Sequence, residues 1–471
     1  GVSRDQRRTS HSRTAGFLSV ACLRCATNTR RGKMSSSSCA GQGQVNYRMV
    51  ISADECEQIV RNSLGSDDAT VIAYDISKIP GHIGFLGEYL QLEVTAENDG
   101  VQSKERYFLK SLPLSDLNQR AMMEEMGFFR KEVGIYSKIL ARFGHNDGPS
   151  KWRPNCYLTR DDLIVLEDLK WRRGFGMVHF QTALKQPHLH LVLETVAQMH
   201  ALSLNYEYNC VGGQRLDELH ADMLFEASVK TDNDWFMAGL AGIKAIALNG
   251  TRYCRDPVKK QIMEQELDDK LNQIFEIVKP TKEFQNTLVH RDIWLNNLMF
   301  QFENDNLQAP KTCVLLDFQI CRYLPPIIDF LLTLYLTTRR SHRDEFLQHY
   351  FDFYYNQLAT KLKQFQLDPD RILSRDQLQR SMRHYKIVAH VFAGIYLALT
   401  NLPATVLDQL HQDDPEQYHQ YCNGNRDEFL LKYLREDEFY RETMTECVEE
   451  TVEYFFGFDR DSARVRVDED P

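Results

Sequence analysis

The stretch Leu288-Val-His-Arg-Asp-Ile-Trp-Leu-Asn-Asn-Leu-Met-Phe300 decides how the rest of the chain is interpreted. It holds Asp292, with Asn297 five residues further on. Transfer of a phosphoryl group to a hydroxyl needs a carboxylate that orients the alcohol and takes its proton, and an oxygen ligand for Mg²⁺ beside it. We therefore predict Asp292 as the catalytic base and Asn297 as a catalytic residue and magnesium ligand, on a loop between two short strands.

A second motif, Cys313-Val-Leu-Leu-Asp-Phe-Gln319, places Asp317 at the end of an apolar strand. A kinase positions there the carboxylate that holds Mg²⁺ against the phosphates of ATP. A β-hairpin is expected between Asp292 and Asp317, so both can reach one cleft. The two motifs predict a kinase that uses ATP and Mg²⁺, with Asp317 as a catalytic residue and Asn297 and Asp317 as the metal ligands.

The nucleotide-binding half is expected upstream, around Lys110. This lysine ends the apolar segment Tyr107-Phe-Leu-Lys110, where an unpaired charge would be costly. Glu132 lies beside the apolar stripe of the next helical segment, and a Lys–Glu pair of this kind positions ATP phosphates. The alternative is a surface lysine and a solvated glutamate. We favour the pair because of the motifs downstream.

Two further segments are predicted to contact the nucleotide. Gly81 and Gly84 belong to a glycine-containing loop that lets backbone amides approach phosphate, although an ordinary hairpin turn explains the same pattern. The segment from 163 to 169 predicts a strand that leads into an inter-lobe hinge. Backbone atoms of Glu167, Asp168 and Leu169 are expected to contact the adenine.

The order of the periodic patterns predicts an α+β fold of the protein-kinase-like, two-lobed type, with a small β-rich N-lobe and a large, mainly helical C-lobe. A short helix is expected over 49–65, followed by strands. Apolar residues every three to four positions from Met123 to Leu140 predict one helix. Helical patterns dominate after about residue 189, apart from a β-rich island over 288–318.

The expected domain boundaries follow from these patterns. They are a disordered or artefactual leader at 1–48, the nucleotide-binding N-lobe at 49–168, the C-lobe at 169–460 and a disordered tail at 461–471. The C-lobe would carry the catalytic loop, the magnesium site and a helical substrate pocket.

Composition limits the partners and the compartment. The net charge of −10 argues against a nucleic-acid partner. The sequence contains no run of about 18 apolar residues, so we predict no membrane-spanning helix. The 11 cysteines are scattered, as is typical of reduced thiols in the cytoplasm. Residues 1–33 are rich in arginine, which leaves a mitochondrial transit peptide as the minor alternative to a cytoplasmic location.

Beyond these motifs, the chain resembles the ecdysteroid kinase-like (CHK kinase-like) family, which is related to choline kinases and aminoglycoside phosphotransferases. The resemblance covers roughly residues 75–430. The matching residues are Tyr107-Phe-Leu-Lys110, Phe129, Glu132, Tyr136, Leu166-Glu-Asp-Leu169, Gly174-Phe175, Met199-His-Ala-Leu-Ser203, His290-Arg-Asp-Ile-Trp294, Asn296-Asn-Leu-Met-Phe300, Asp317-Phe-Gln319 and Pro326-Ile-Ile-Asp329.

The resemblance implies a phosphotransferase that acts on a steroid-like alcohol (an ecdysteroid) or another small alcohol. It also implies that Asp329 supports the catalytic loop, although an N-cap of the apolar helix that follows is the simpler reading of this residue. His290 is expected to pack under the loop and to support it through hydrogen bonds.

Arg291 is a departure from the family, which usually has glycine between the His and the Asp of the loop. A bulky side chain at this position leaves a catalytically impaired nucleotide- or ligand-binding pseudokinase as the alternative. The His-Arg-Asp motif is also the form found in protein kinases, so a protein kinase is a further alternative. Gln319 in place of glycine and the short interval from Asp317 to Asp329 argue against a protein kinase.

Overall fold

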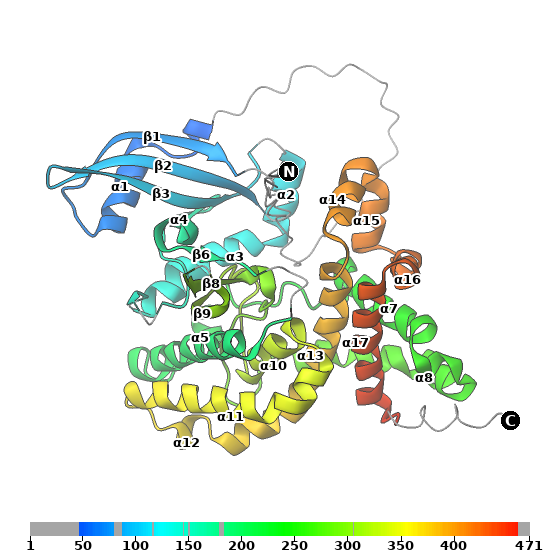
Figure 1. Ribbon diagram of the computed structural model, residues 1–471. Helices are drawn as coiled ribbons and strands as arrows, with labels where there is room; N and C mark the ends of the chain where they lie inside the picture. The colour runs from blue at the N-terminus through cyan, green and yellow to red at the C-terminus, as the bar shows by residue number, and fades with distance from the viewer. Residues whose placement is uncertain are drawn as a thin grey trace, which may run out of the picture.

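An antiparallel sheet of five strands forms the first lobe of the computed structural model (Figure 1). The structure describes residues 47–79, 87–114, 117–144, 146–148, 151–178, 183–304 and 306–459. In the order β1-β2-β3-β5-β4 the strands are β1 (Thr70–Lys78), β2 (Glu88–Asn98), β3 (Val101–Ser111), β5 (Leu163–Glu167) and β4 (Cys156–Arg160).

Helix α1 (Ala53–Leu64) covers one face of this sheet. It begins where Ser52 and Glu55 form a reciprocal capping box, which explains why the helix is shorter than the expected 49–65. Its buried side chains join a core with the β3 residues Tyr107 and Leu109. Lys110 must therefore point to the opposite face of the sheet, as the alternation of β3 predicts.

The segment that follows β3 is broken into several helical pieces. They are α2 (Leu117–Met126), α3 (Phe128–Gly134), a π-helical turn (Ile135–Ile139) and a 3₁₀ turn (Leu140–Arg142). The expectation of one helix from Met123 to Leu140 is therefore wrong. Gly127, with φ of 72°, adopts the left-handed conformation between α2 and α3, which redirects the chain.

The second lobe is mainly helical, as expected (Figure 1). Its longer helices are α5 (Gln186–Asn205), α7 (Asp234–Gly250), α8 (Pro257–Asn272), α10 (Ile327–Thr337), α11 (Arg340–Gln364), α13 (Arg375–Thr400), α14 (Ala404–Asp413), α15 (Pro415–Asn423), α16 (Asp427–Glu436) and α17 (Glu438–Phe456). Shorter helices are α4 (Leu169–Arg173), α6 (Leu216–Leu219), α9 (Ile274–Ile277) and α12 (Pro369–Ile372).

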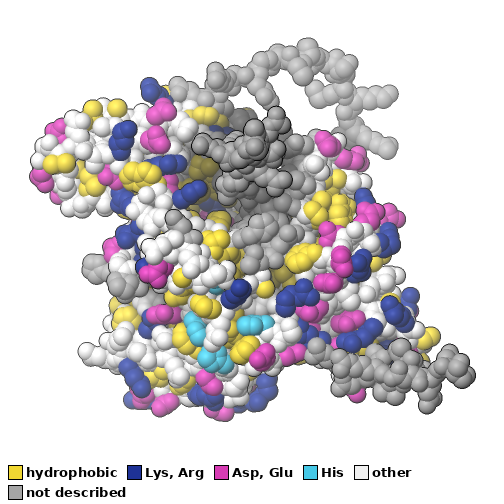
Figure 2. Space-filling view, viewed as in Figure 1, with side chains coloured by type: hydrophobic (Ala, Val, Ile, Leu, Met, Phe, Trp, Pro, Cys, Tyr) yellow, Lys and Arg dark blue, Asp and Glu magenta, His cyan; other side chains and the backbone are white. Residues whose placement is uncertain are grey.

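Helix α10 forms the centre of this lobe, because every one of its residues is buried. It packs against α5, α11 and α13. Within the described part of the chain, we find no helix that combines the length and hydropathy needed to cross a bilayer. Figure 2 shows acidic and basic side chains interspersed over the face in view, without one extended basic patch.

Two small sheets lie within the second lobe. In one, β7 (Thr287–Val289) pairs with β10 (Arg322–Leu324). In the other, β8 (Leu298–Glu303) lies between β6 (Phe175–Gly176) and β9 (Asn306–Leu315). The short strands predicted on either side of the 290–297 loop are thus present as β7 and β8.

Candidate active site

Two loops lie side by side because the strands at their ends pair with each other. The first loop connects β7 to β8 and carries Asp292, and the second connects β9 to β10 and carries Asp317. Since β7 pairs with β10 and β8 pairs with β9, the loops are held against each other. Asp317 has φ of 64°, a left-handed conformation that is uncommon outside glycine and typical of functional sites.

Asp292 is fully buried, and Asn297 holds one of its carboxylate oxygens. The side-chain amide of Asn297 donates to Oδ2 of Asp292 at 2.8 Å and to its backbone oxygen at 2.9 Å. The other oxygen, Oδ1, is buried and has no hydrogen-bond partner within the described part of the chain. A buried acceptor of this kind is costly unless a ligand completes it.

The surroundings of Asp292 change its acidity. Burial, with a smaller effect of the negative charge of Asp317, raises the pKa of Asp292 to about 7, and the side chains of Tyr396 and Asn297 oppose the rise. A carboxylate with a pKa near neutrality can both accept and release a proton, which suits a general base.

Lys110, Glu132 and Asp317 form a buried ionic triad. The ammonium Nζ of Lys110 lies 2.6 Å from Oε2 of Glu132 and 3.2 Å from Oδ1 of Asp317. The second oxygen of Glu132 accepts the backbone N–H of Phe318 at 3.3 Å. The structure therefore brings the predicted Lys–Glu pair of the N-lobe onto the Asp317 loop of the C-lobe.

The triad favours the charged form of the lysine. Burial alone lowers the pKa of Lys110, but the carboxylates of Asp317 and Glu132 outweigh burial and raise it above its usual value. Burial raises the pKa of Glu132, against the opposing effect of Lys110. One cation between two carboxylates leaves an excess of negative charge, which a metal ion or a further cation would balance.

The predicted magnesium ligands suit that ion. The amide nitrogen of Asn297 donates to Asp292, and its side-chain oxygen Oδ1 is the type of atom that binds magnesium. The side chain of Asp317 is 12% exposed. Magnesium prefers oxygen ligands and binds through one or two carboxylates together with phosphate oxygens and water. Asn297 and Asp317 therefore fit the role, which stays a prediction.

Asp329 supports the loop between β7 and β8 through hydrogen bonds. It lies inside α10, whose N-cap is Pro326, so the N-cap interpretation of Asp329 is wrong. Its carboxylate accepts the backbone N–H groups of His290 at 2.7 Å and of Arg291 at 2.8 Å. It also lies 3.0 Å from Nε2 of His200. These contacts fix the backbone that leads into Asp292.

His290 links the two loops, as expected of a supporting residue. Its Nε2 lies 2.9 Å from the backbone oxygen of Leu316, and its Nδ1 accepts the N–H of Asp292 at 3.2 Å. The ring packs edge-on against Phe318, and burial lowers its pKa. This pattern requires a neutral imidazole with the proton on Nε2.

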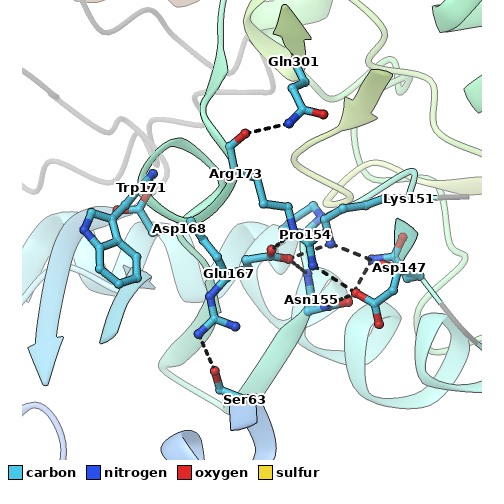
Figure 3. A network of polar contacts seen from close by, with 12 residues as sticks. Ser63, Asp147, Lys151, Pro154, Asn155, Glu167, Asp168, Trp171, Arg173 and Gln301 are labelled. Carbon is cyan, nitrogen blue, oxygen red and sulfur yellow. Dashed lines mark hydrogen bonds and ion pairs between the residues drawn. The ribbon is translucent and has the colours of Figure 1, made fainter. Parts of the chain in front are cut away.

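The hinge is held by side chains as well as by backbone. The Glu167 carboxylate lies 2.6 Å from Lys151 Nζ and 2.7 Å from Arg173 Nε (Figure 3). Glu167 also donates its N–H to the Asn155 carbonyl, and the Asp168 carbonyl accepts an N–H within α4. The contacts of Glu167, Asp168 and Leu169 with adenine stay a prediction.

A small apolar cluster lies between the hinge and the Asp317 loop. Leu169, Phe175 and Val314 form its buried part, and Met299 and Leu316 pack against it while partly exposed. Partly exposed apolar surface of this kind is typical of sites that bind small molecules. Of these residues, only Leu169 was predicted from the sequence. The others lie in β6, β8 and β9 or directly after β9, and the pairing of these strands brings them together.

Two tyrosines near the carboxylates were also missed. Tyr89 lies opposite Lys110 in the β2–β3 pair, and its pKa is raised to about 12 by burial. Tyr396, on α13, interacts with Asp292 and lowers its pKa. Neither belongs to a motif. The predicted glycine-loop residues Gly81 and Gly84 lie outside the described residues.

A family model described as the ecdysteroid kinase-like family matches residues 84–367, more than half of the chain. This range contains every predicted site residue except Gly81. A solved ethanolamine kinase from Plasmodium vivax is 12% identical over 79% of this chain and 83% of that chain, with a TM-score of 0.37, too low to carry an argument. The search of curated proteins returned no match.

Proposed function

Because the chain belongs to the ecdysteroid kinase-like family, we propose that it transfers a phosphoryl group from ATP, in the presence of Mg²⁺, to a hydroxyl group of a small molecule. A steroid-like alcohol such as an ecdysteroid is the favoured acceptor, within the wider class of small alcohols. One observation carries the proposal: Asn297 holds one oxygen of Asp292, and the other oxygen is buried without a hydrogen-bond partner in the described structure. An acceptor hydroxyl would complete it.

Each residue of the site has a role in this proposal. Asp292 orients the acceptor hydroxyl and takes its proton. Lys110, fixed by Glu132, binds the phosphates, and Asn297 and Asp317 hold Mg²⁺. When bound, ATP with Mg²⁺ supplies the phosphoryl group and the positive charge that offsets its oxygens. Positioning and charge then account for most of the catalysis.

Aromatic rings near Asp292 support an acceptor with apolar surface. Tyr396, which interacts with Asp292, packs against Phe392 with ring centroids 5.7 Å apart and edge-on against Trp235 at 6.1 Å. Trp294 follows in the catalytic loop, and its buried indole N–H has no hydrogen-bond partner among the residues described. Such surroundings favour a lipophilic alcohol over a polycationic one.

The two alternatives have less support. The chain from Phe318 to Ile328 is taken up by β10 and the start of α10, which leaves little room for a segment that binds a peptide, as a protein kinase requires. The Arg291 side chain, which motivated the pseudokinase alternative, is paired with Glu226 and does not bond to Asp292.

The test is phosphate transfer from labelled ATP, with Mg²⁺, to a panel of ecdysteroids, choline, ethanolamine and aminoglycosides. We expect product with an ecdysteroid or a related alcohol. Asp292→Asn preserves the shape of the site and should reduce transfer by about 10³-fold or more, with ATP binding retained. Asp256→Asn, at the N-cap of α8, is the matched control and should be neutral.

Three results would contradict the proposal or part of it. Transfer to a protein substrate alone would favour a protein kinase. Magnesium-dependent ATP binding without product from any acceptor would favour the pseudokinase. Choline or ethanolamine as the preferred acceptor would retain the small-molecule kinase and reject the steroid-like substrate.

A further inference from the structure

Arg291 is anchored by a carboxylate from a distant segment of the C-lobe. Its Nη1 lies 2.6 Å from Oε2 of Glu226, in the connection between α6 and α7. The same oxygen accepts a hydrogen bond from Nη1 of Arg322 at 2.8 Å. Arg322 belongs to β10, directly after the Asp317 loop. One carboxylate therefore ties together the chain segments on both sides of the proposed magnesium site.

The second oxygen of Glu226 is fully used as well. Oε1 accepts the backbone N–H groups of Ser228 and Val229, both at 3.0 Å, and the Ser228 hydroxyl at 3.2 Å. These bonds fix the carboxylate in one orientation before any ligand binds. A preorganised carboxylate of this kind can hold two guanidinium groups at a defined position.

The same connection also reaches the N-lobe. Lys131, which precedes Glu132 in α3, donates to the backbone oxygen of Phe225 at 2.8 Å, and its ammonium lies 5.1 Å from the centre of the Phe225 ring. Lys131 is 1% exposed. Phe225 and Glu226 thus contact the three elements that carry Glu132, Asp292 and Asp317.

The backbone at Arg291 explains why such an anchor is needed. Its φ is 65°, in the left-handed region that glycine adopts freely and that costs free energy for a residue with a Cβ atom. An arginine there keeps the catalytic loop in shape only if its contacts outweigh that cost. The guanidinium supplies such contacts: it bonds to Glu226, its Nη2 lies 3.4 Å from Ser228 Oγ, and its Cζ lies 5.5 Å from the centre of the Phe392 ring.

We infer that Glu226 is a positioning residue: it holds Arg291, Arg322 and, through its neighbour Phe225, the Glu132 helix in the arrangement that catalysis requires. Phosphorylation can order kinase loops by pairing an added phosphate with arginine. Here a carboxylate encoded in the chain occupies the equivalent chemical role, so the loop is held in place without modification. Arg291 then supports the active loop instead of impairing it. The inference rests on the proposed function for its kinetic part only.

Glu226→Gln is the variant that tests it, because glutamine keeps an oxygen for Ser228 and Val229 and replaces the charge that faces the two arginines. We expect kcat to fall roughly 10- to 100-fold with little change in KM for ATP, as for a small displacement of the reacting groups. Glu446→Gln is the matched control, since Glu446 also accepts an arginine and a backbone N–H, but on α17.

A double-mutant cycle separates positioning from general stability. In an Arg291→Gly background one of the two arginines that Glu226 holds is absent, so Glu226→Gln should reduce kcat by a clearly smaller factor than in the native chain. Equal losses in both backgrounds, or an unchanged kcat in the single variant, would overturn the inference.

Hydrogen exchange of the loop amides at 290–297 needs no acceptor and distinguishes the two proposals. Glu226→Gln should increase exchange there about 10-fold or more, while Glu446→Gln should not. If the native chain transfers no phosphate, the proposed function fails and exchange alone decides this inference. Unchanged exchange in Glu226→Gln would overturn it, and a global increase over the whole chain would assign Glu226 a merely structural role.

Discussion

The ammonium of Lys110 lies 3.2 Å from the carboxylate of Asp317, although 207 residues separate them in the chain. This contact joins the N-lobe sheet to the loop that is proposed to bind magnesium. It also shows that the lobes are closed around the site, because β3 supplies one partner and the β9–β10 loop supplies the other.

Replacing that lysine should separate nucleotide binding from folding. Lys110→Met leaves Glu132 and Asp317 as two buried carboxylates without their cation, so we expect ATP affinity to fall at least about 10-fold and phosphate transfer about 10²-fold or more. Isothermal titration with ATP and Mg²⁺ measures the first effect. Lys311→Met removes an exposed ion pair on β9 and should change neither. Native-like ATP affinity in Lys110→Met would refute the assignment.

Asp329 should matter for both stability and rate. Each carboxylate oxygen of Asp329 accepts a backbone N–H, and one of them also faces His200. In Asp329→Asn an NH₂ group replaces one of these oxygens and faces a donor instead of accepting from it. We therefore expect a loss of about 2–3 kcal/mol in the free energy of unfolding. We also expect a lower kcat, because the loop before Asp292 loses its support. Urea unfolding and steady-state kinetics measure the two effects. Asp437→Asn, at the N-cap of α17, is the control. A variant with full stability and normal kcat would show that the brace is dispensable.

The hinge ion pair should stabilise the fold rather than contact the nucleotide. Glu167→Gln leaves the buried ammonium of Lys151 without its carboxylate, and we expect a loss of about 3 kcal/mol, measured by urea unfolding. Glu167→Leu combined with Lys151→Met removes both charges and should recover much of this loss. If the double variant is as unstable as the sum of the single variants, the two side chains do not interact as the structure indicates.

Acid should weaken the protein through Glu226. Burial by itself raises the pKa of Glu226, but Arg291 and Arg322, with a smaller effect of Lys131, lower it to about 2 from 4.5. The unfolded chain therefore binds the proton more tightly than the folded one. Its contribution is complete above pH 4.5 and is lost as the pH falls toward 2, amounting to about 3 kcal/mol.

The check is the free energy of unfolding measured from pH 6 to pH 3. We expect it to fall more steeply with acidity for the native chain than for Glu226→Gln, by up to about 1.4 kcal/mol per pH unit. Parallel curves for the two proteins would show that the carboxylate titrates normally in the folded state.

Much of the site could be predicted because its residues occur in short, local patterns. Alternating apolar residues placed Lys110 on the inner face of β3, and the spacing of Asp292, Asn297 and Asp317 placed the loops between strands. The helix over 123–140 was predicted less well, since a single glycine, Gly127, breaks a segment whose apolar period continues on both sides.

The sequence by itself determined the two-lobed fold class, the catalytic motifs and the pairing of Lys110 with Glu132, because strand alternation, helical period and motif spacing are local properties of the chain. Only the tertiary structure decided which distant groups complete the site. Glu226 reaches Arg291 over 65 residues, and Tyr396 reaches Asp292 from α13. No local period encodes such contacts, since they depend on how whole helices pack around the loops.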